Sequence, residues 1–270
     1  MARTSGQGQT KRFGAARARA NLKRARVRIS IVLAPAVPLA LRLAMSGVFT
    51  LILETSSPHA SLALAGADGS LLVREFFSDR NHNARLFGPL AELLESSAGG
   101  RIARVLVGSG PGSYSGTRVG IAAAQGVAIA NACEVVAVAS ILAVPAAAHG
   151  APCLAMGDAR RGSYWSAQVA ASRMVAPPGL TDAAGLCEAV AAAVAQGLAV
   201  ITFEEPARFP LPDALAARVQ QQFPSAERLW RAWCLADAAT QAAWAGSAPQ
   251  PIYLNPPHIT PAKRPWWVST

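Results

Sequence analysis

The chain has 270 residues, of which 52% are hydrophobic, and it carries a formal net charge of +10. This length predicts one large domain or two small ones, and the apolar content is ample for a buried core. The four cysteines are widely spaced and include no CxxC pair, which argues against a zinc knuckle or a disulfide framework and favours thiols buried in a reducing cytosol. No run beyond residue 44 reaches the ~18 uninterrupted apolar residues of a membrane span, so we expect a soluble, cytoplasmic protein without a membrane partner.

The positive charge is concentrated in residues 1–44. This segment holds ten of the 25 Lys and Arg residues and no acidic residue, so the remaining 15 basic residues balance the 15 acidic ones. A secretory signal fits the basic stretch and the apolar residues after it, although Pro35 and Pro38 interrupt the apolar run. A basic arm that contacts nucleic acid also fits the charge. We favour a third interpretation, in which translation starts at Met45 and residues 1–44 are an untranslated or disordered extension.

Residues 45–143 have the pattern of a first lobe, a mixed sheet flanked by helices. Asp68-Gly69 between two apolar runs is a strong hairpin signal. Leu86, Leu90 and Leu93 recur at spacings of three and four, which predicts one apolar face of a helix. We expect strands at 48–53, 61–64, 71–77, 102–107 and 134–138, and helices at 84–96 and 117–131.

A glycine-rich loop at residues 108–120 joins the fourth predicted strand to the second helix. Such a turn directs backbone N–H groups and a helix N-terminus to one place, an arrangement that holds anions. A Walker A loop would need a lysine after Gly116, where Thr117 stands. The dinucleotide pattern beginning at Gly110 would need a third glycine where Ser115 stands. The loop therefore matches neither common nucleotide fingerprint.

Residues 144–248 are expected to form a second lobe. Alanine occurs on every face of its predicted helices, as high helix propensity and genomic base composition would produce. Residues 249–270 contain six prolines, which predicts an irregular, extended tail. Beyond the first lobe we expect strands at 153–156, 163–170 and 198–203, and helices at 140–149, 182–196, 212–222 and 226–245.

Five segments carry motifs that occur in the same order in one family. The glycine loop contains G-P-G-S-Y-S-G-T-R-V-G, residues 51–64 look like an opening hairpin usually written ILAIDTS, and residues 81–90 are similar to HSERLLPLI. Residues 158–165 look like DARRGEVY, and residues 251–254 look like a closing P-x-Y-L. In these segments the chain resembles the bacterial TsaB family of tRNA threonylcarbamoyladenosine synthesis. The resemblance covers residues 48–165 well and the remainder only by length and the closing motif.

The resemblance implies an α/β, actin-like ATPase (ribonuclease H-like) fold in two lobes, with the second lobe reduced. It also implies a non-catalytic scaffold in the complex that transfers a threonylcarbamoyl group to the tRNA adenosine next to the anticodon. The partners would be a catalytic paralogue (TsaD-like), which this chain stabilises, and an ATPase subunit (TsaE-like). tRNA would be contacted indirectly, ATP would enter through the complex rather than bind this chain, and the chain alone would form a homodimer.

Two other functions are weighed against the scaffold. A stand-alone ATP-dependent small-molecule kinase of the same superfold would need intact acidic phosphate loops in both lobes, and only the first is recognisable. A direct tRNA-binding module would need a basic stripe, which the neutral body of the chain lacks.

The first hairpin of actin-like ATPases carries an acidic residue that organises the metal ion, and Glu54 fills that place here. The alternative is that Glu54 and Thr55 only close a turn. The four histidines are more than twenty residues apart, so no HxxxH or HExxH spacing exists, and we expect neither a metal site nor a catalytic residue. The candidate phosphate or nucleotide loop comprises Glu54, Thr55, Ser56, Gly110, Gly112, Ser113 and Gly116.

Small residues recur every four positions in the helix after the loop, and such a stripe lets another helix approach closely. The stripe either packs within its own lobe or pairs with the catalytic paralogue. Arg118 lies in the first turn, where the helix dipole disfavours a cation, so it needs a carboxylate or a phosphate, and we favour a carboxylate of this protein or its partner over a ligand phosphate. The predicted partner interface comprises His82, Leu86, Arg118, Gly120, Ala124 and Ala128.

Overall fold

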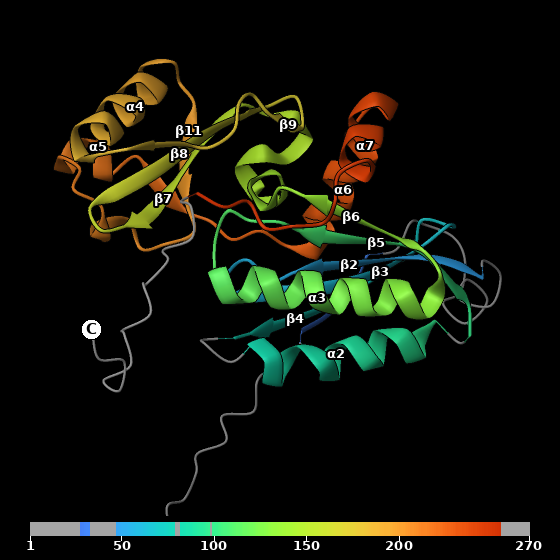
Figure 1. Cartoon of the computed structure of the whole chain (residues 1–270). Coiled ribbons are helices and arrows are strands. Elements are labelled where there is room, and N and C mark those ends of the chain that lie inside the picture. The colour runs from blue at the N-terminus through green and yellow to red at the C-terminus, as the bar shows by residue number, and fades with distance from the viewer. Residues whose placement is uncertain (1–27, 33–46, 79–81, 98, 255–270) are drawn as a thin grey trace, which may run out of the picture.

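The computed structural model describes residues 28–32, 47–78, 82–97 and 99–254 (Figure 1). The predicted basic extension lies outside the described residues except for one short strand, and so do residues 255–270 of the predicted tail. The strands of the first lobe are β1 (Arg28–Val32), β2 (Val48–Glu54), β3 (His59–Gly66), β4 (Leu71–Phe77), β5 (Arg101–Gly108) and β6 (Glu134–Val138). Those of the second lobe are β7 (Cys153–Arg160), β8 (Ser163–Ala170), β9 (Arg173–Met174), β10 (Gly179–Thr181), β11 (Ala199–Thr202) and β12 (Val219–Gln221).

The two sheets repeat one topology. The first has the order β1-β4-β3-β2-β5-β6, and the second has the order β10-β8-β7-β11-β12, with β9 beside β8. In the first sheet β2 forms an antiparallel hairpin with β3 and also pairs in parallel with β5, which follows a helix. In the second sheet β7 forms an antiparallel hairpin with β8 and also pairs in parallel with β11, which follows a helix. The carboxyl ends of these parallel strands meet at one edge of each sheet, which is where open α/β folds bind ligands.

The helices form separate layers on the sheets. α2 and α3 cover one face of the first sheet, and α6 lies on its opposite face (Figure 1). α4 packs on the second sheet. No helix within the described ranges is long and apolar enough to cross a membrane. The helices are α2 (His82–Ser96), α3 (Tyr114–Asn131), α4 (Ala183–Ala195), α5 (Asp213–Ala216), α6 (Ala226–Leu235) and α7 (Ala238–Ala245), and the 3-10 helices are η1 (Ser140–Ala143), η2 (Pro145–Gly150) and η3 (Pro206–Arg208).

Successive side chains along a strand point to opposite faces of its sheet, and this divides the apolar residues among three cores. In β7, Cys153 and Ala155 face a core shared by the two sheets, whereas Leu154 and Met156 face the core under α4. The third core lies between the first sheet and the helices α2 and α3. α6 contacts β2, β3 and β5, so this late segment of the chain returns to the first sheet. The two lobes therefore share one continuous apolar layer.

The expected strands and helices of the first lobe are all present, with small shifts at their ends. α3 begins three residues before its predicted start, because Ser113 caps it by accepting a hydrogen bond from the Gly116 N–H. β1, which was not expected, pairs antiparallel with β4 at the edge of the sheet.

Several expectations for the second lobe are wrong. The predicted helix at 140–149 is two 3-10 helices, because Val144 is extended and Pro145 has no N–H to continue an α-helix. The predicted helix at 212–222 is the single turn of α5 followed by β12, which pairs with β11. The predicted helix at 226–245 breaks at Ala236, which is extended, and Asp237 caps the new helix α7. The short strands β9 and β10 were not expected either.

Candidate functional site

Glu54 ends β2 with a completely buried side chain. Its Oε1 accepts a hydrogen bond of 2.8 Å from the Ser56 backbone N–H, which closes the turn into β3. Its Oε2 has no hydrogen-bond partner among the described residues. Burial raises the pKa of the Glu54 carboxyl above its ordinary value, and the nearby hydroxyls of Ser56 and Ser140 oppose this only in part. The surroundings therefore favour the neutral acid.

The glycine loop packs directly on this turn. The Ser113 N–H donates to the Ser56 carbonyl oxygen at 2.6 Å. The Thr55 hydroxyl donates to the Gly116 carbonyl oxygen at 2.8 Å. These two hydrogen bonds join segments far apart in the chain and place the N-terminus of α3 against the end of β2. The turn and the loop form one packed unit.

Glycine is required where the backbone approaches this turn most closely. A Cβ on Gly108 would overlap the Glu54 carboxylate and lie 2.6 Å from the Ser140 hydroxyl oxygen. A Cβ on Gly112 would overlap the Ser56 carbonyl oxygen. The Gly110 N–H, between them, donates to Ser140 Oγ at 3.0 Å. The glycines thus serve close packing of the loop.

The three residues of the turn after β2 are shielded from solvent. Glu54, Thr55 and Ser56 are each at most 1% exposed, and their ordered hydrogen bonds join them to one another or to the glycine loop. This burial agrees with the closed-turn alternative, and the role of these residues in a phosphate loop stays a prediction. Gly110, Gly112, Ser113 and Gly116 lie together in the glycine loop, and phosphate binding by them stays a prediction. Across the described ranges, no three His, Cys, Asp or Glu side chains gather as metal ligands.

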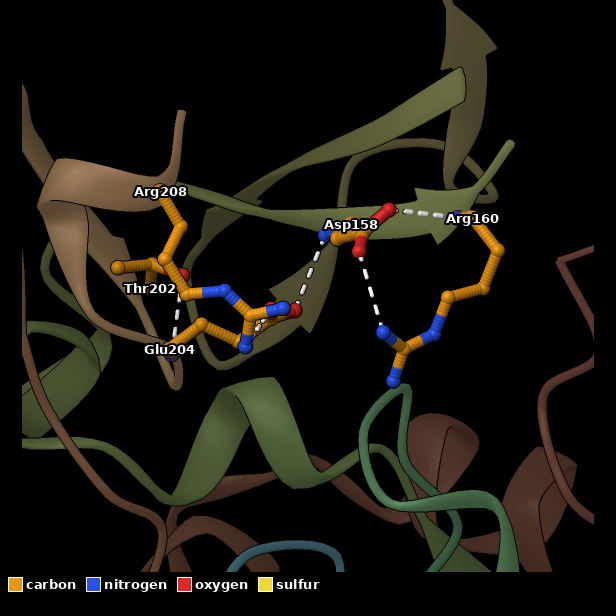
Figure 2. A network of polar contacts seen from close by, with 5 residues as sticks. All are labelled: Asp158, Arg160, Thr202, Glu204 and Arg208. Atoms are coloured by element: carbon orange, nitrogen blue, oxygen red, sulfur yellow. Dashed lines mark hydrogen bonds and ion pairs between the residues drawn. The ribbon is translucent and has the colours of Figure 1, made fainter. Parts of the chain in front are cut away.

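The matching position in the second lobe carries a partly buried polar network whose arginines are exposed (Figure 2). Asp158 lies near the end of β7 as Glu54 lies at the end of β2. Its backbone N–H donates to Glu204 Oε1 at 3.0 Å, and its Oδ1 accepts from the Arg160 N–H at 2.6 Å. The guanidinium of Arg208 lies 3.6 Å from Glu204 Oε2. Arginines therefore pair with both carboxylates of this network.

The small-residue stripe of α3 faces the interior of the first lobe. Gly120, Ala124 and Ala128 are buried against the sheet, and Leu86 of α2 is buried in the same core. A Cβ on Gly120 would overlap Thr55 Oγ1. These four residues offer no surface to a partner, so burial corrects their assignment to the partner interface. His82 begins α2, and its side chain lies outside the described residues.

A groove of about 740 Å³ lies between the outer faces of α2 and α3. Arg118 and Asn131 mark its two ends, and the residues between them are apolar or glycine. Phe87 also lines the groove, and its large apolar side chain is 56% exposed. The other lining residues are Leu90, Leu94, Val119, Ala122, Ala123, Gly126, Val127 and Ala130.

Sequence reasoning missed this second apolar face of α3, together with Ser140, Tyr114 and Tyr253. A signal for the groove was present, because Val119, Ala123 and Val127 form a stripe beside the buried one. A helix that is apolar on two faces buries one in its own core and leaves the other for a second contact. The closing P-x-Y-L motif contains Tyr253 but did not indicate its contact with Arg118, and no local pattern indicated Ser140, since both residues meet the loop or α3 only after folding.

Residues 76–223, more than half of the chain, match the family model described as TsaD, tRNA N6-adenosine threonylcarbamoyltransferase. The tRNA threonylcarbamoyladenosine biosynthesis protein TsaB of Haemophilus influenzae is 31% identical over 131 residues, which cover 46% of this chain and 55% of that protein. The Escherichia coli protein of the same name is 31% identical over 123 residues, covering 43% of this chain and 53% of that protein. The chain thus spans about half the length of these curated relatives.

Two solved structures from Pseudomonas aeruginosa share the fold. One is a protein with similarity to peptidase YeaZ, with a TM-score of 0.55 and 22% identity, and the other is YeaZ, with a TM-score of 0.54 and 21% identity. Each match covers 78% of this chain and 100% of the other. With the family model over residues 76–223, they confirm the predicted actin-like, ribonuclease H-like α/β fold. Together with the glycine-loop motif, these similarities show that the chain belongs to the family of that model and is a TsaB-family protein.

Proposed function

We propose that this chain acts in tRNA threonylcarbamoyladenosine biosynthesis as a non-catalytic scaffold that holds a TsaD-like catalytic subunit. The names of its curated relatives support the pathway. The observation that carries the scaffold role is the apolar groove between α2 and α3. A TsaE-like ATPase subunit would join the pair and bring ATP with it, and tRNA would be contacted through the complex. Without a partner, a second copy of the chain would cover the groove.

The groove has the properties of a helix-docking surface. A contiguous apolar patch on a soluble protein marks an interaction site, because its exposure to water is costly. Gly126, Ala122 and Ala130 are small, which lets a partner helix approach to the 8–10 Å axis separation of packed helices. Phe87 and Val119 provide larger apolar side chains that would be removed from water on binding. A helical partner surface fits these dimensions.

The chemistry at the strand ends supports a scaffold over a kinase. A phosphate-transferring enzyme needs an acidic residue that reaches the metal ion. Glu54 is buried with its carboxyl group beside Ser140, and in the second lobe arginines pair with Asp158 and Glu204. No observation on the described residues favours the kinase alternative.

The test is the mass of the full-length chain mixed with the TsaD-like protein of the same organism, measured by size-exclusion chromatography with light scattering. We expect a mixed complex at micromolar concentrations. Ala123→Glu places a carboxylate in the groove, where burial of an unpaired charge costs several kcal/mol, and it should abolish the complex. Gln125→Glu is the control, since residue 125 is exposed on the same helix outside the groove. Separate elution of the two wild-type proteins would overturn the proposal.

A further inference from the structure

Arg118 lies at the N-terminal end of the groove between two tyrosine rings. Its guanidinium carbon is 3.9 Å from the centroid of the Tyr114 ring and 5.5 Å from that of Tyr253. One of its amino groups donates to the Tyr253 hydroxyl at 3.0 Å. Both tyrosines are exposed over more than half of their surface, so the cluster faces solvent. Stacking holds the guanidinium in a fixed plane with most of its donors unused.

The cluster depends on the C-terminal segment as well as on α3. The Ile252 N–H donates to the Ser109 carbonyl oxygen at 2.9 Å. Ile252 and Leu254 pack against the core that the two sheets share, on either side of Tyr253. Tyr253 is thus held over Arg118 by a segment 135 residues away in the chain. Such support indicates a preorganised group rather than a freely rotating surface arginine.

No carboxylate balances Arg118 in the part of the chain that the structure describes. The five ion pairs found there use other arginines, and the first turn of α3 contains no acidic residue. A cation in the first turn of a helix is also disfavoured by the helix dipole. Arg118 therefore combines an unpaired charge with a fixed position beside an apolar surface.

We propose that Arg118, held by Tyr114 and Tyr253, binds a carboxylate of the helical partner that occupies the groove, with the guanidinium as the hydrogen-bond donor. This inference rests on the proposed scaffold function. Arg118 is the one charged residue among the described residues that line the groove, so charge complementarity assigns the partner an apolar helical face with one Asp or Glu at its end. Tyrosine and arginine are the residue types that most often dominate interface affinity, which fits this placement. The apolar contacts would supply affinity, and the ion pair would fix the direction of the docked helix.

The experiment measures the dissociation constant of the full-length chain and its TsaD-like partner at low and high salt. We expect Arg118→Gln to weaken binding by roughly 10- to 100-fold and to flatten the salt dependence, because a charge-assisted hydrogen bond is lost. Tyr253→Phe keeps the ring but removes the acceptor that orients Arg118, and it should weaken binding less. Arg231→Gln removes the same charge from α6, which lies on the opposite face of the first sheet from α2 and α3 (Figure 1), and should leave affinity unchanged.

A charge-reversal pair completes the test. Arg118→Glu should abolish binding, and one Asp or Glu to Lys change on the partner should restore it. If the wild type binds the partner and the Arg118→Gln variant has the same dissociation constant, this inference is wrong and the scaffold function stands. If Arg118→Gln weakens only the affinity of the assembled complex for tRNA, the anion is a phosphate and the inference is wrong. Absence of any wild-type binding would overturn both proposals.

Discussion

Adding one methyl group at Gly120 or at Gly126 should change stability in opposite directions. Both glycines lie inside α3, where alanine is better than glycine by about 1 kcal/mol. Around Gly126 a Cβ would meet nothing within 4 Å, so Gly126→Ala should gain that amount. At Gly120 the same Cβ would overlap the hydroxyl of Thr55, which is fully buried and bonded to the Gly116 carbonyl.

The cost at Gly120 has two parts. Overpacking a well-packed site costs about 1–3 kcal/mol. Displacing Thr55 also breaks a buried hydrogen bond, which contributes about 1–1.5 kcal/mol. After the helix-propensity gain, Gly120→Ala should lose about 1–3.5 kcal/mol of unfolding free energy. For a chain of this size, the middle of that range lowers Tm by roughly 5–9 °C, whereas Gly126→Ala should raise Tm by about 2–4 °C.

Urea unfolding of the two variants and the wild type, followed by circular dichroism, measures these differences with the unmodified chain as reference. Equal m-values would confirm that the same structure unfolds in all three proteins. Stabilisation of Gly120→Ala to the same extent as Gly126→Ala would show that Thr55 moves aside freely, and the packed unit of turn and loop would then be refuted.

Two further predictions concern buried titrating groups. Because the folded pKa of Glu54 is raised above 4.5, the stability that its neutral form contributes is fully present below that pH and is lost as pH rises through the folded pKa. The Glu54→Gln variant should therefore become more stable relative to the wild type as pH rises, by up to about 1.4 kcal/mol per pH unit. Urea titrations of both proteins at several pH values measure this difference. A stability difference that does not change with pH would contradict the prediction. Burial raises the pKa of the Cys153 thiol to about 11, so at pH 8 a thiol reagent should label Cys234, which is exposed, well before Cys153. If Cys153 and Cys234 of the folded protein are labelled at comparable rates, Cys153 is not buried. The Cys153→Ser variant is the control that identifies the signal of Cys153.

The sequence predicted the first lobe better than the second for a local reason. Leu86, Leu90 and Leu93 repeat at helical spacing beside polar residues, so α2 was visible in the chain itself. In the segment after Ser225, alanine suits every face of a helix, and nothing except Asp237 marked the break between α6 and α7. The strand β12 was missed because its pairing with β11 overrides a weak local preference for helix.

The candidate site shows the same division. The motif from Gly110 to Gly120 located the glycine loop and, to within three residues, the start of α3. The buried face of α3 was not decided by the sequence, because Ala124 and Ala123 belong to two stripes of similar apolarity. Burial of Ala124 on the sheet left the face of Ala123 to the groove.

The sequence by itself determined β2 to β6 with the helices α2 and α3, the glycine loop and the family motifs, because these depend on residues that are neighbours in the chain. Only the tertiary structure decided that Glu54 is sealed inside, that α3 presents its second stripe outward and that Tyr253 holds Arg118. The physical reason is that burial and stacking arise between segments far apart in the chain. The pairing of Arg118 with Tyr253 exists only once the C-terminal segment has folded across the glycine loop.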